Sequence, residues 1–394
     1  MSKKIRKFPK DFLWGAAVSS YQVEGGIENC DWSEKFPAGK ACDYYNQYEK
    51  YFDLAKELNH GVHRFSLEWS RIQPSEGKFD RKEIEHYRRV LQALKKRNIK
   101  SMVTIWHFTL PTWLSEKGGL HNIKFPEYFE SFAKFVTEEL DDLVDFWVTL
   151  NEPMVYLSLA YLEGRFSPQK KKSFYTPLVF VNFVRAHKKA FNIIKDINPN
   201  ANVGTAQNYC YSDAYNKKSF LNKGLVKIAD FVTNHSFSKF INKYSDFIGV
   251  NYYFHNRIRL TPFSSPFAKI DNENKKVSDM NWEIFPKGLY FVLKDMKKYN
   301  KPIYITENGI ADAKDEKRSE FIKEHLKWMH KAIEDGVDVR GYMYWSLIDN
   351  FEWDSGFAKR FGLVEIDYQN GLETKIRQSA YDYAEICKKN ELVV

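Results

Sequence analysis

Two glutamates in this chain occupy matching positions at the ends of apolar, strand-like segments. Glu152 follows the run from Phe146 to Asn151, and Glu307 closes the run that begins at Pro302. Each glutamate adjoins an asparagine, and a proline or a glycine that breaks a strand follows within two residues. Packing does not explain these acids, because burying an ionised carboxylate is costly unless it has a partner or a task. Two carboxylates that face each other across one site are the groups that hydrolyse glycosidic bonds.

The segments that would position these glutamates alternate between short β-rich runs and longer amphipathic runs. Helical patterns cover residues 83–97, 125–140, 176–197, 288–299 and 318–335. Strands are predicted at 12–19, 63–69, 100–107, 146–151, 202–208, 246–253, 302–307 and 340–347. Eight strands, each followed by helical sequence, predict an α/β protein with a single (β/α)8 TIM barrel, formed as one catalytic domain over residues 1–394. A doubly wound sheet is less favoured, because no glycine-rich phosphate-binding turn follows a strand.

Catalytic groups of such a barrel lie at the carboxyl ends of its strands. In this chain the eight predicted strand ends deliver polar or aromatic side chains that could converge on one rim. In chain order these are Gln22, Glu68 with Trp69, His107, Asn151 with Glu152, Asn208, Asn251 with Tyr253, Glu307 with Asn308, and Trp345. We interpret Glu68 as a structural residue and the rim as a candidate site.

Composition and charge exclude several other classes of function. The formal net charge is +9, but lysine and arginine alternate with acidic residues and no nucleic-acid-binding motif is present, so nucleic-acid binding is not predicted. The four cysteines show no CxxC or Cys/His pattern, and we expect no metal and no cofactor. With no apolar signal segment and no run of 18 apolar residues, the sequence predicts a cytoplasmic protein without a membrane partner. It makes no prediction about the oligomeric state.

Seven segments carry a resemblance to a known family. They read FLWGAAVSSYQVEG at 12–25, RFSLEWSRI at 64–72, WHFTLPTWL at 106–114, TLNEP at 149–153, GVNYY at 249–253, ITENG at 305–309 and WSLIDNFEW at 345–353. Together, and in this order, they resemble glycoside hydrolase family one, the β-glucosidase family. The resemblance implies a retaining exo-β-glycosidase that acts on terminal β-D-glucosyl residues, with β-galactosyl and β-fucosyl residues as further substrates.

The resemblance also implies roles for the two carboxylates. Glu152 would be the general acid/base and Glu307 the nucleophile, and Arg64 and Tyr253 would keep Glu307 ionised. The dimensions of an eight-stranded barrel place the two carboxylates about 6 Å apart, between the separations of roughly 5–5.5 Å and 6.5–9.5 Å that mark retaining and inverting enzymes. Geometry at this level leaves the stereochemistry open, and the resemblance favours retention.

Six further residues would bind the small-molecule β-glycoside. By resemblance, Glu352 would reach O4 and O6 of the nonreducing sugar, Asn151 its 2-hydroxyl, and Trp345 would form a platform under the ring. Gln22, His107 and Trp353 would contact the remaining hydroxyls.

Alternatives remain within and outside this enzyme class. A 6-phosphosugar preference is disfavoured, since such relatives carry serine in place of Glu352 and a tyrosine in place of Phe361. Thioglucosidases carry glutamine in place of Glu152. A transglycosylase and a non-hydrolytic carbohydrate-binding barrel are kept as alternatives. The connections at 168–177 and 209–246 are expected to be short for the family, which leaves the preference for the leaving group open.

Overall fold

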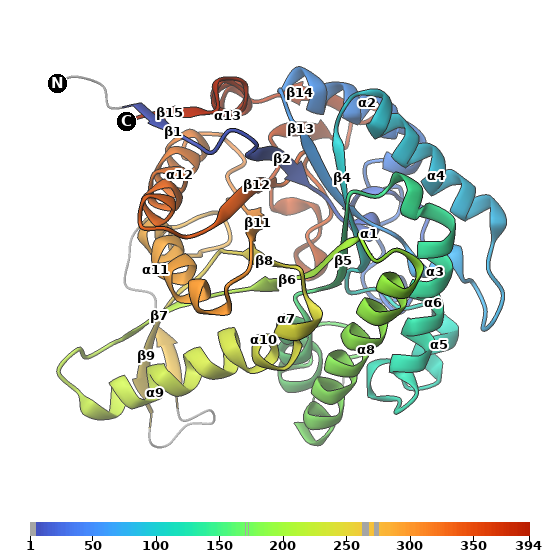
Figure 1. The fold of residues 1–394 in the computed structure, drawn as a ribbon, viewed down its shortest axis with the longest axis horizontal. Coiled ribbons are helices and arrows are strands. Elements are labelled where there is room, and N and C mark those ends of the chain that lie inside the picture. Colours follow the sequence, from blue (N-terminus) through green and yellow to red (C-terminus); the bar gives the residue numbers. More distant parts are fainter. Residues whose placement is uncertain (1–4, 170, 172, 262–267, 272–275) are drawn as a thin grey trace.

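Eight parallel strands close into a barrel in the computed structural model, which describes residues 5–169, 171, 173–261, 268–271 and 276–394 (Figure 1). In order around the barrel they are β2 (Leu13–Ala17), β3 (Val62–Ser66), β4 (Lys100–Trp106), β5 (Phe146–Asn151), β6 (Asn202–Asn208), β8 (Phe247–Asn251), β11 (Ile303–Asn308) and β12 (Val339–Trp345). The predicted (β/α)8 barrel is confirmed, and β5 and β6 have the predicted bounds.

Helices surround the strands on the outside of the barrel, as Figure 1 shows. The long ones are α2 (Tyr44–Glu57), α4 (Arg81–Lys96), α6 (Phe125–Leu140), α8 (Thr176–Ile197), α11 (Pro286–Met296), α12 (Arg318–Glu334) and α13 (Gln378–Lys389). In α4 the buried Ile84, Tyr87, Leu91 and Leu94 recur every three or four residues, the spacing of one helix face, and this stripe packs toward the barrel. The same periodicity fixed the predicted bounds of α6 and α8, which the structure confirms.

The barrel interior is filled by a cluster that draws a buried apolar residue from every strand. Its members are Ala17, Val62, Met102, Phe146, Val148, Ala206, Phe247, Tyr304 and Met343, with Trp345 at the end of β12. Side chains from all eight strands can meet only inside the closed sheet. The inside is therefore a packed core, and polar groups can gather only at its ends.

Several predicted strands extend too far toward their carboxyl ends, including those at 246–253 and 340–347, where β8 ends at Asn251 and β12 at Trp345. The sequence predicted strand at 12–19 and 63–69, but β2 ends at Ala17 and β3 at Ser66. Short helices follow at once, α1 (Ser20–Val23) and α3 (Trp69–Ile72). The Glu68 side chain accepts a hydrogen bond from the Ser70 backbone N–H and caps α3.

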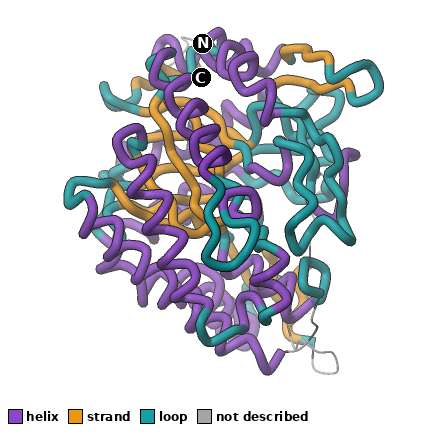
Figure 2. Tube along the Cα trace, turned by 90° about the vertical axis from the view of Figure 1, so that its right-hand side faces the viewer, coloured by secondary structure: helices purple, strands orange, loops and turns teal. Residues whose placement is uncertain are grey.

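Three smaller sheets lie outside the barrel. β1 (Ile5–Lys7) pairs antiparallel with β15 (Glu391–Val393), so the two ends of the described chain lie together (Figures 1 and 2). β13 (Val364–Asp367) pairs with β14 (Glu373–Ile376), and β7 (Tyr211–Ala214), β9 (His255–Leu260) and β10 (Ala268–Asp271) form a third sheet.

The connection across 209–246 is structured, and its shortness relative to the family stays a prediction. This segment holds β7, the helix α9 (Phe220–Asp230) and the helix α10 (Ser236–Ile241). Within α9, a helix that was not assigned from the sequence, only Asn222 is buried, so its apolar residues do not face the core. None of the helices in the described ranges combines the length and apolar character needed to cross a bilayer.

Candidate active site

Glu152 lies immediately beyond β5, at the start of the short helix α7 (Pro153–Leu157). Its φ of 44° is in the left-handed region that non-glycine residues seldom adopt. Pro153 occupies the first turn of the helix, where a missing N–H leaves no hydrogen bond unmade. The Glu152 N–H donates to the Ala206 carbonyl at 2.8 Å, which anchors this turn on the neighbouring β6. A strained backbone held at a strand end is typical of a functional position.

Glu307 lies on β11 and is bound by a cation and a phenol. Arg64 Nη1 donates to Glu307 Oε1 at 2.5 Å, and the Tyr253 hydroxyl donates to Oε2 at 2.9 Å. Arg64 and Glu307 are 1% and 5% exposed through their side chains, so little solvent screens this ion pair. The predicted neighbours of Glu307 are therefore in contact with it.

A continuous hydrogen-bond chain connects the two glutamates. Arg64 Nη2 donates to Asn151 Oδ1 at 2.7 Å. The same oxygen accepts from Asn251 Nδ2 at 3.2 Å, and that amide also donates to Glu152 Oε1 at 2.8 Å. The chain holds the two carboxylates on one rim in fixed positions, which a two-carboxylate reaction requires.

Asn251 and Asn208 are site residues that the residue-by-residue assignment from sequence missed. Asn208 Nδ2 also reaches Glu152 Oε1, at 3.4 Å, and Thr306 Oγ1 orients Asn251 by donating to its Oδ1 at 2.6 Å. The signal that could have found them was present, since the sequence already places both asparagines at the rim, and they end β6 and β8.

Burial and mutual charge raise the pKa of Glu152 to about 8. Desolvation is the largest cause, followed by the negative charge of Glu307, and the amides of Asn251 and Asn208 only partly oppose the rise. Burial also raises the pKa of Glu307, but Arg64 and Tyr253 oppose that rise directly. Since Glu307 has the cation and Glu152 has only neutral donors, Glu307 ionises first and Glu152 keeps its proton near neutral pH.

Gln22 and Glu352 form a second polar cluster from distant parts of the chain. Gln22 Nε2 donates to Glu352 Oε2 at 3.2 Å and to Asn350 Oδ1 at 3.0 Å, and Ser19 donates to Gln22 Oε1 at 2.6 Å. Desolvation, and next the charge of Glu307, raises the pKa of Glu352 to about 8. The charges of Glu307 and Glu152 both contribute to the raised pKa of Glu352.

His107 carries an unpaired polar atom among aromatic rings. Its ring stacks on Trp345 and Trp353, with centroids 6.0 and 5.9 Å away. The Asn151 oxygen already accepts two bonds, so its Nδ2 donates to His107 Nε2, 3.1 Å away. Burial and the Arg64 charge hold the pKa of His107 well below its ordinary value, so the neutral ring carries its proton on Nδ1. That buried Nδ1 has no partner among the described residues and is available to a ligand hydroxyl.

The structural interpretation of Glu68 agrees with its contacts. Its carboxylate is fully buried and accepts from the hydroxyls of Ser20, Ser70 and Thr109 as well as from the Ser70 N–H. These bonds tie the segments after β2, β3 and β4 together behind the rim.

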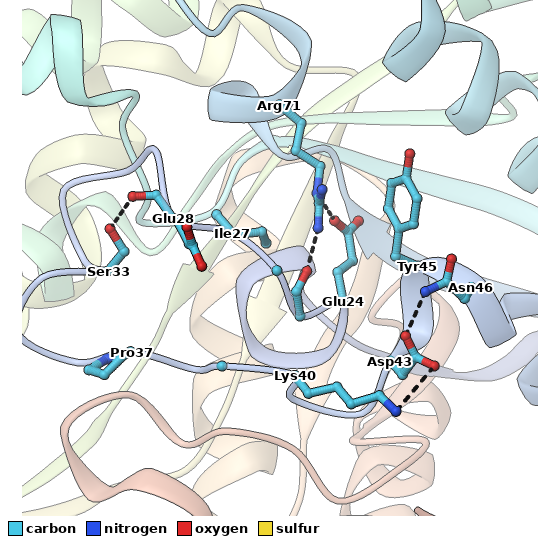
Figure 3. A pocket seen from close by; sticks show the side chains of 13 residues that line it. Glu24, Ile27, Glu28, Ser33, Pro37, Lys40, Asp43, Tyr45, Asn46 and Arg71 are labelled. Carbon is cyan, nitrogen blue, oxygen red and sulfur yellow. Dashed lines mark hydrogen bonds and ion pairs between the residues drawn. The ribbon is translucent and has the colours of Figure 1, made fainter.

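A hollow of about 480 Å³ is lined by residues that follow the first two barrel strands, and it is not the catalytic site (Figure 3). Its lining includes Glu24, Lys40, Asp43 and Arg71, and none of the predicted site residues. Arg71 donates to Glu24 at 2.9 Å, and Lys40 lies 4.0 Å from Asp43, so these charged groups satisfy one another.

One cluster in the described part of the chain has the donor atoms of a metal site, away from the glutamate pair. Asp230, His235 and Asp295 bring a nitrogen and two carboxylate oxygens together. The Lys298 ammonium already contacts His235 Nε2 at 3.0 Å and Asp295 at 3.1 Å and supplies the positive charge there.

The barrel and the paired glutamates at its rim define a glycoside hydrolase. The chain matches the model of glycosyl hydrolase family 1 over residues 4–220 and 214–392, and it belongs to that family. The sequence is 32% identical to "Beta-glucosidase A" of Acetivibrio thermocellus in an alignment 442 residues long. The alignment covers 97% of this chain and 98% of the relative. The alignment is longer than this 394-residue chain, so the relative carries insertions relative to it.

Two solved structures share the fold over nearly the whole chain. The beta-glycosidase from Pyrococcus horikoshii has a TM-score of 0.93 and 37% identity, with 99% of this chain and 96% of that chain covered. The beta-glucosidase from Thermotoga maritima in complex with glucoimidazole has a TM-score of 0.92 and 29% identity, with 98% and 99% covered.

Proposed function

We propose that the protein is a retaining exo-β-glycosidase that hydrolyses terminal β-D-glucosyl residues, and also β-galactosyl and β-fucosyl residues, within one catalytic domain over residues 1–394. The observation that carries the proposal is the unequal environment of the two carboxylates. Arg64 is paired with Glu307, whereas Glu152 is buried among neutral amides and has its pKa raised to about 8. A nucleophile must be ionised and a general acid protonated, and the two environments match those roles.

The reaction would proceed in two displacements. Glu307 attacks the anomeric carbon while Glu152 protonates the departing glycosidic oxygen, which leaves a covalent glycosyl-enzyme and a free leaving group. Esterification removes the charge of Glu307, so the pKa of Glu152 falls and its carboxylate can accept a proton from water. That water then releases the sugar with its original β-configuration.

Substrate recognition would use the second polar cluster and the aromatic rings. Glu352 and Gln22 would bind hydroxyls together, with the Glu352 carboxyl at O4 and O6, and His107 would donate from its unpaired Nδ1. Asn151, which Arg64 orients, would contact the 2-hydroxyl. Trp345 would support the sugar ring, and Trp353, stacked on His107, would close the hydroxyl-binding side.

A panel of chromogenic substrates tests this function. The protein should release nitrophenol from aryl β-glucoside, and more slowly from the β-galactoside and β-fucoside, and should reject 6-phospho-β-glucoside. No turnover of any neutral β-glycoside would refute the proposal. The non-hydrolytic barrel is not favoured, because both carboxylates are in place with their partners. Transglycosylation has no specific support, and product analysis at high substrate concentration separates it from hydrolysis.

We place the enzyme in a reducing compartment such as the cytoplasm. The four cysteines are free thiols, and three of them are buried in the fold. Disulfides are rare in reducing compartments, and unpaired thiols are ordinary there.

A further inference from the structure

Helix α9 and the π-helical turn that follows it (Phe231–His235) expose an apolar face to solvent. Five apolar side chains of this stretch are between 47% and 85% exposed, namely Phe220, Leu221, Ile228, Phe231 and Val232. A surface helix of a globular protein normally turns its apolar stripe toward the core. In α9 the apolar side chains face solvent instead, and we call these five residues the α9 face.

The α9 face is one continuous side of the helix. Leu221, Ile228 and Val232 are spaced by seven and four residues, which places them above one another on a helix. Asn222, the buried residue of α9, lies off this stripe, about 100° around the helix from Leu221. Figure 1 shows α9 at the lower edge of the molecule, beside β7 and β9 and outside the ring of helices around the barrel.

Exposed lysines lie on α9 and in the chain on either side of it. Six lysines in and around α9 are exposed: Lys217, Lys218, Lys223, Lys227, Lys239 and Lys243. None of the six forms a salt bridge with an acidic residue in the described part of the chain. Lys223 and Lys227 lie on α9 itself, one turn apart, along one edge of the apolar stripe.

We propose that the α9 face binds an anionic lipid surface. An amphipathic helix with apolar residues on one face and lysines along its edge lies flat in the membrane interface. The apolar side chains enter the boundary between headgroups and acyl chains, and the lysine ammonium groups extend to the lipid phosphates. This peripheral contact needs no spanning segment, and it goes beyond the proposed glycosidase activity. It differs from the expectation from sequence that the chain has no membrane partner.

The charges and side-chain types distinguish this partner from two others. A second copy docked through the same face would bring Lys223 and Lys227 against lysines of the same kind, and the net charge of +9 opposes that approach. A nucleic acid would satisfy the lysines, but it stacks its bases on aromatic rings, whereas Leu221 and Ile228 are aliphatic. An anionic lipid surface accommodates both the aliphatic side chains and the lysines.

Vesicle cosedimentation of the full chain tests the proposal. We expect binding to phosphatidylglycerol–phosphatidylcholine vesicles and at least tenfold weaker binding to phosphatidylcholine alone, with high salt reducing the difference. Ile228→Asp should weaken binding to the anionic vesicles at least tenfold. The pair Lys223→Glu and Lys227→Glu should do the same, because each lysine near an anionic surface contributes about fivefold.

Matched controls separate this face from general charge and exposure. Ile123→Asp changes an isoleucine of similar exposure, 65% against 63% for Ile228, elsewhere on the surface. The pair Lys10→Glu and Lys56→Glu makes the same change in net charge through exposed lysines away from α9. Both controls should bind vesicles like the unaltered chain, and all variants should keep aryl-glucosidase activity, which shows that they are folded.

Three outcomes would overturn the proposal. The first is equal binding to anionic and neutral vesicles, or none to either. The second is an equal loss in the α9 variants and in their controls. The third is a dimer in light scattering, or retention of an RNA oligonucleotide, that the α9 variants abolish while vesicle binding is unaffected. Because vesicle binding is measured without substrate, these outcomes do not depend on the proposed catalytic function.

Discussion

Replacing Glu152 with glutamine should stabilise the folded protein above neutral pH while removing its general acid. Burial and the charge of Glu307 raise the pKa of Glu152 from 4.5 to about 8. Between these two values the folded protein retains a proton that the unfolded chain has released. The free energy of unfolding therefore falls as the pH rises through this window. Glutamine carries no charge, so the variant escapes this loss, and its amide oxygen can still accept from Asn251.

The size of the effect follows from the same shift. A rise from 4.5 to about 8 corresponds to about 5 kcal/mol, at about 1.4 kcal/mol for each pH unit. Part of this energy is shared with Glu307 and Glu352, whose charges act on the same buried site. We therefore expect Glu152→Gln to raise the free energy of unfolding by about 2–4 kcal/mol at pH 8.5 and by less than about 0.5 kcal/mol at pH 4.5.

Urea denaturation at intervals between pH 4.5 and 8.5 measures the difference between the two proteins. Glu85→Gln, which changes an exposed glutamate on α4, is the matched control and should leave the free energy of unfolding within about 0.5 kcal/mol at every pH. A gain that does not grow with pH, or a variant less stable than the unaltered protein at pH 8.5, would refute the reasoning about Glu152.

Three further predictions concern catalysis. Glu307→Gly should fold but lose hydrolysis, and azide should restore turnover of an activated aryl glucoside with an α-configured product; near-normal activity without azide would show that Glu307 is not the nucleophile. Glu352→Ser should lower kcat/KM for β-glucosides at least tenfold, since two hydrogen bonds of about 0.5–1.5 kcal/mol each are lost, and should lessen discrimination against 6-phosphoglucosides. Preference of the unaltered enzyme for the phosphosugar would contradict this role. The kcat/KM for cellobiose should fall as the pH rises through about 8, where Glu152 loses the proton it must donate. A profile that is level across pH 8 would argue against Glu152 as the acid.

Local sequence signals sufficed for the barrel and for the two glutamates. The barrel strands are short apolar runs, and the helices carry apolar residues with a period of 3.6. Both patterns arise because these elements pack against a core. Glu152 and Glu307 stood out because a carboxylate at the end of a buried strand contradicts packing. Contacts among predicted residues, such as Arg64 with Glu307 and Gln22 with Glu352, agree with the roles that the family resemblance assigned.

Three features could not be predicted from the sequence, because they depend on contacts between distant residues or on which residues are exposed in the fold. The bridging role of Asn251 requires the register of β8 against its neighbours, which brings its amide to Asn151 and Glu152 from 100 and 99 residues away. The raised pKa of Glu352 depends on burial beside Glu307, which no local pattern encodes. Helix α9 was not assigned from the sequence, and no sequence pattern shows that its apolar residues face solvent.

The covalent intermediate is the most direct test of the central claim. A 2-deoxy-2-fluoro-β-glucoside with a dinitrophenyl leaving group should inactivate the enzyme. The fluorine slows both formation and hydrolysis of the glycosyl-enzyme, and the good leaving group restores the rate of formation only. Mass spectrometry of the digested protein should then find one fluoroglucosyl unit on the peptide that contains Glu307, and Glu307→Gln should not be labelled. Label on Glu152 instead, or turnover to an inverted product without any label, would contradict the account.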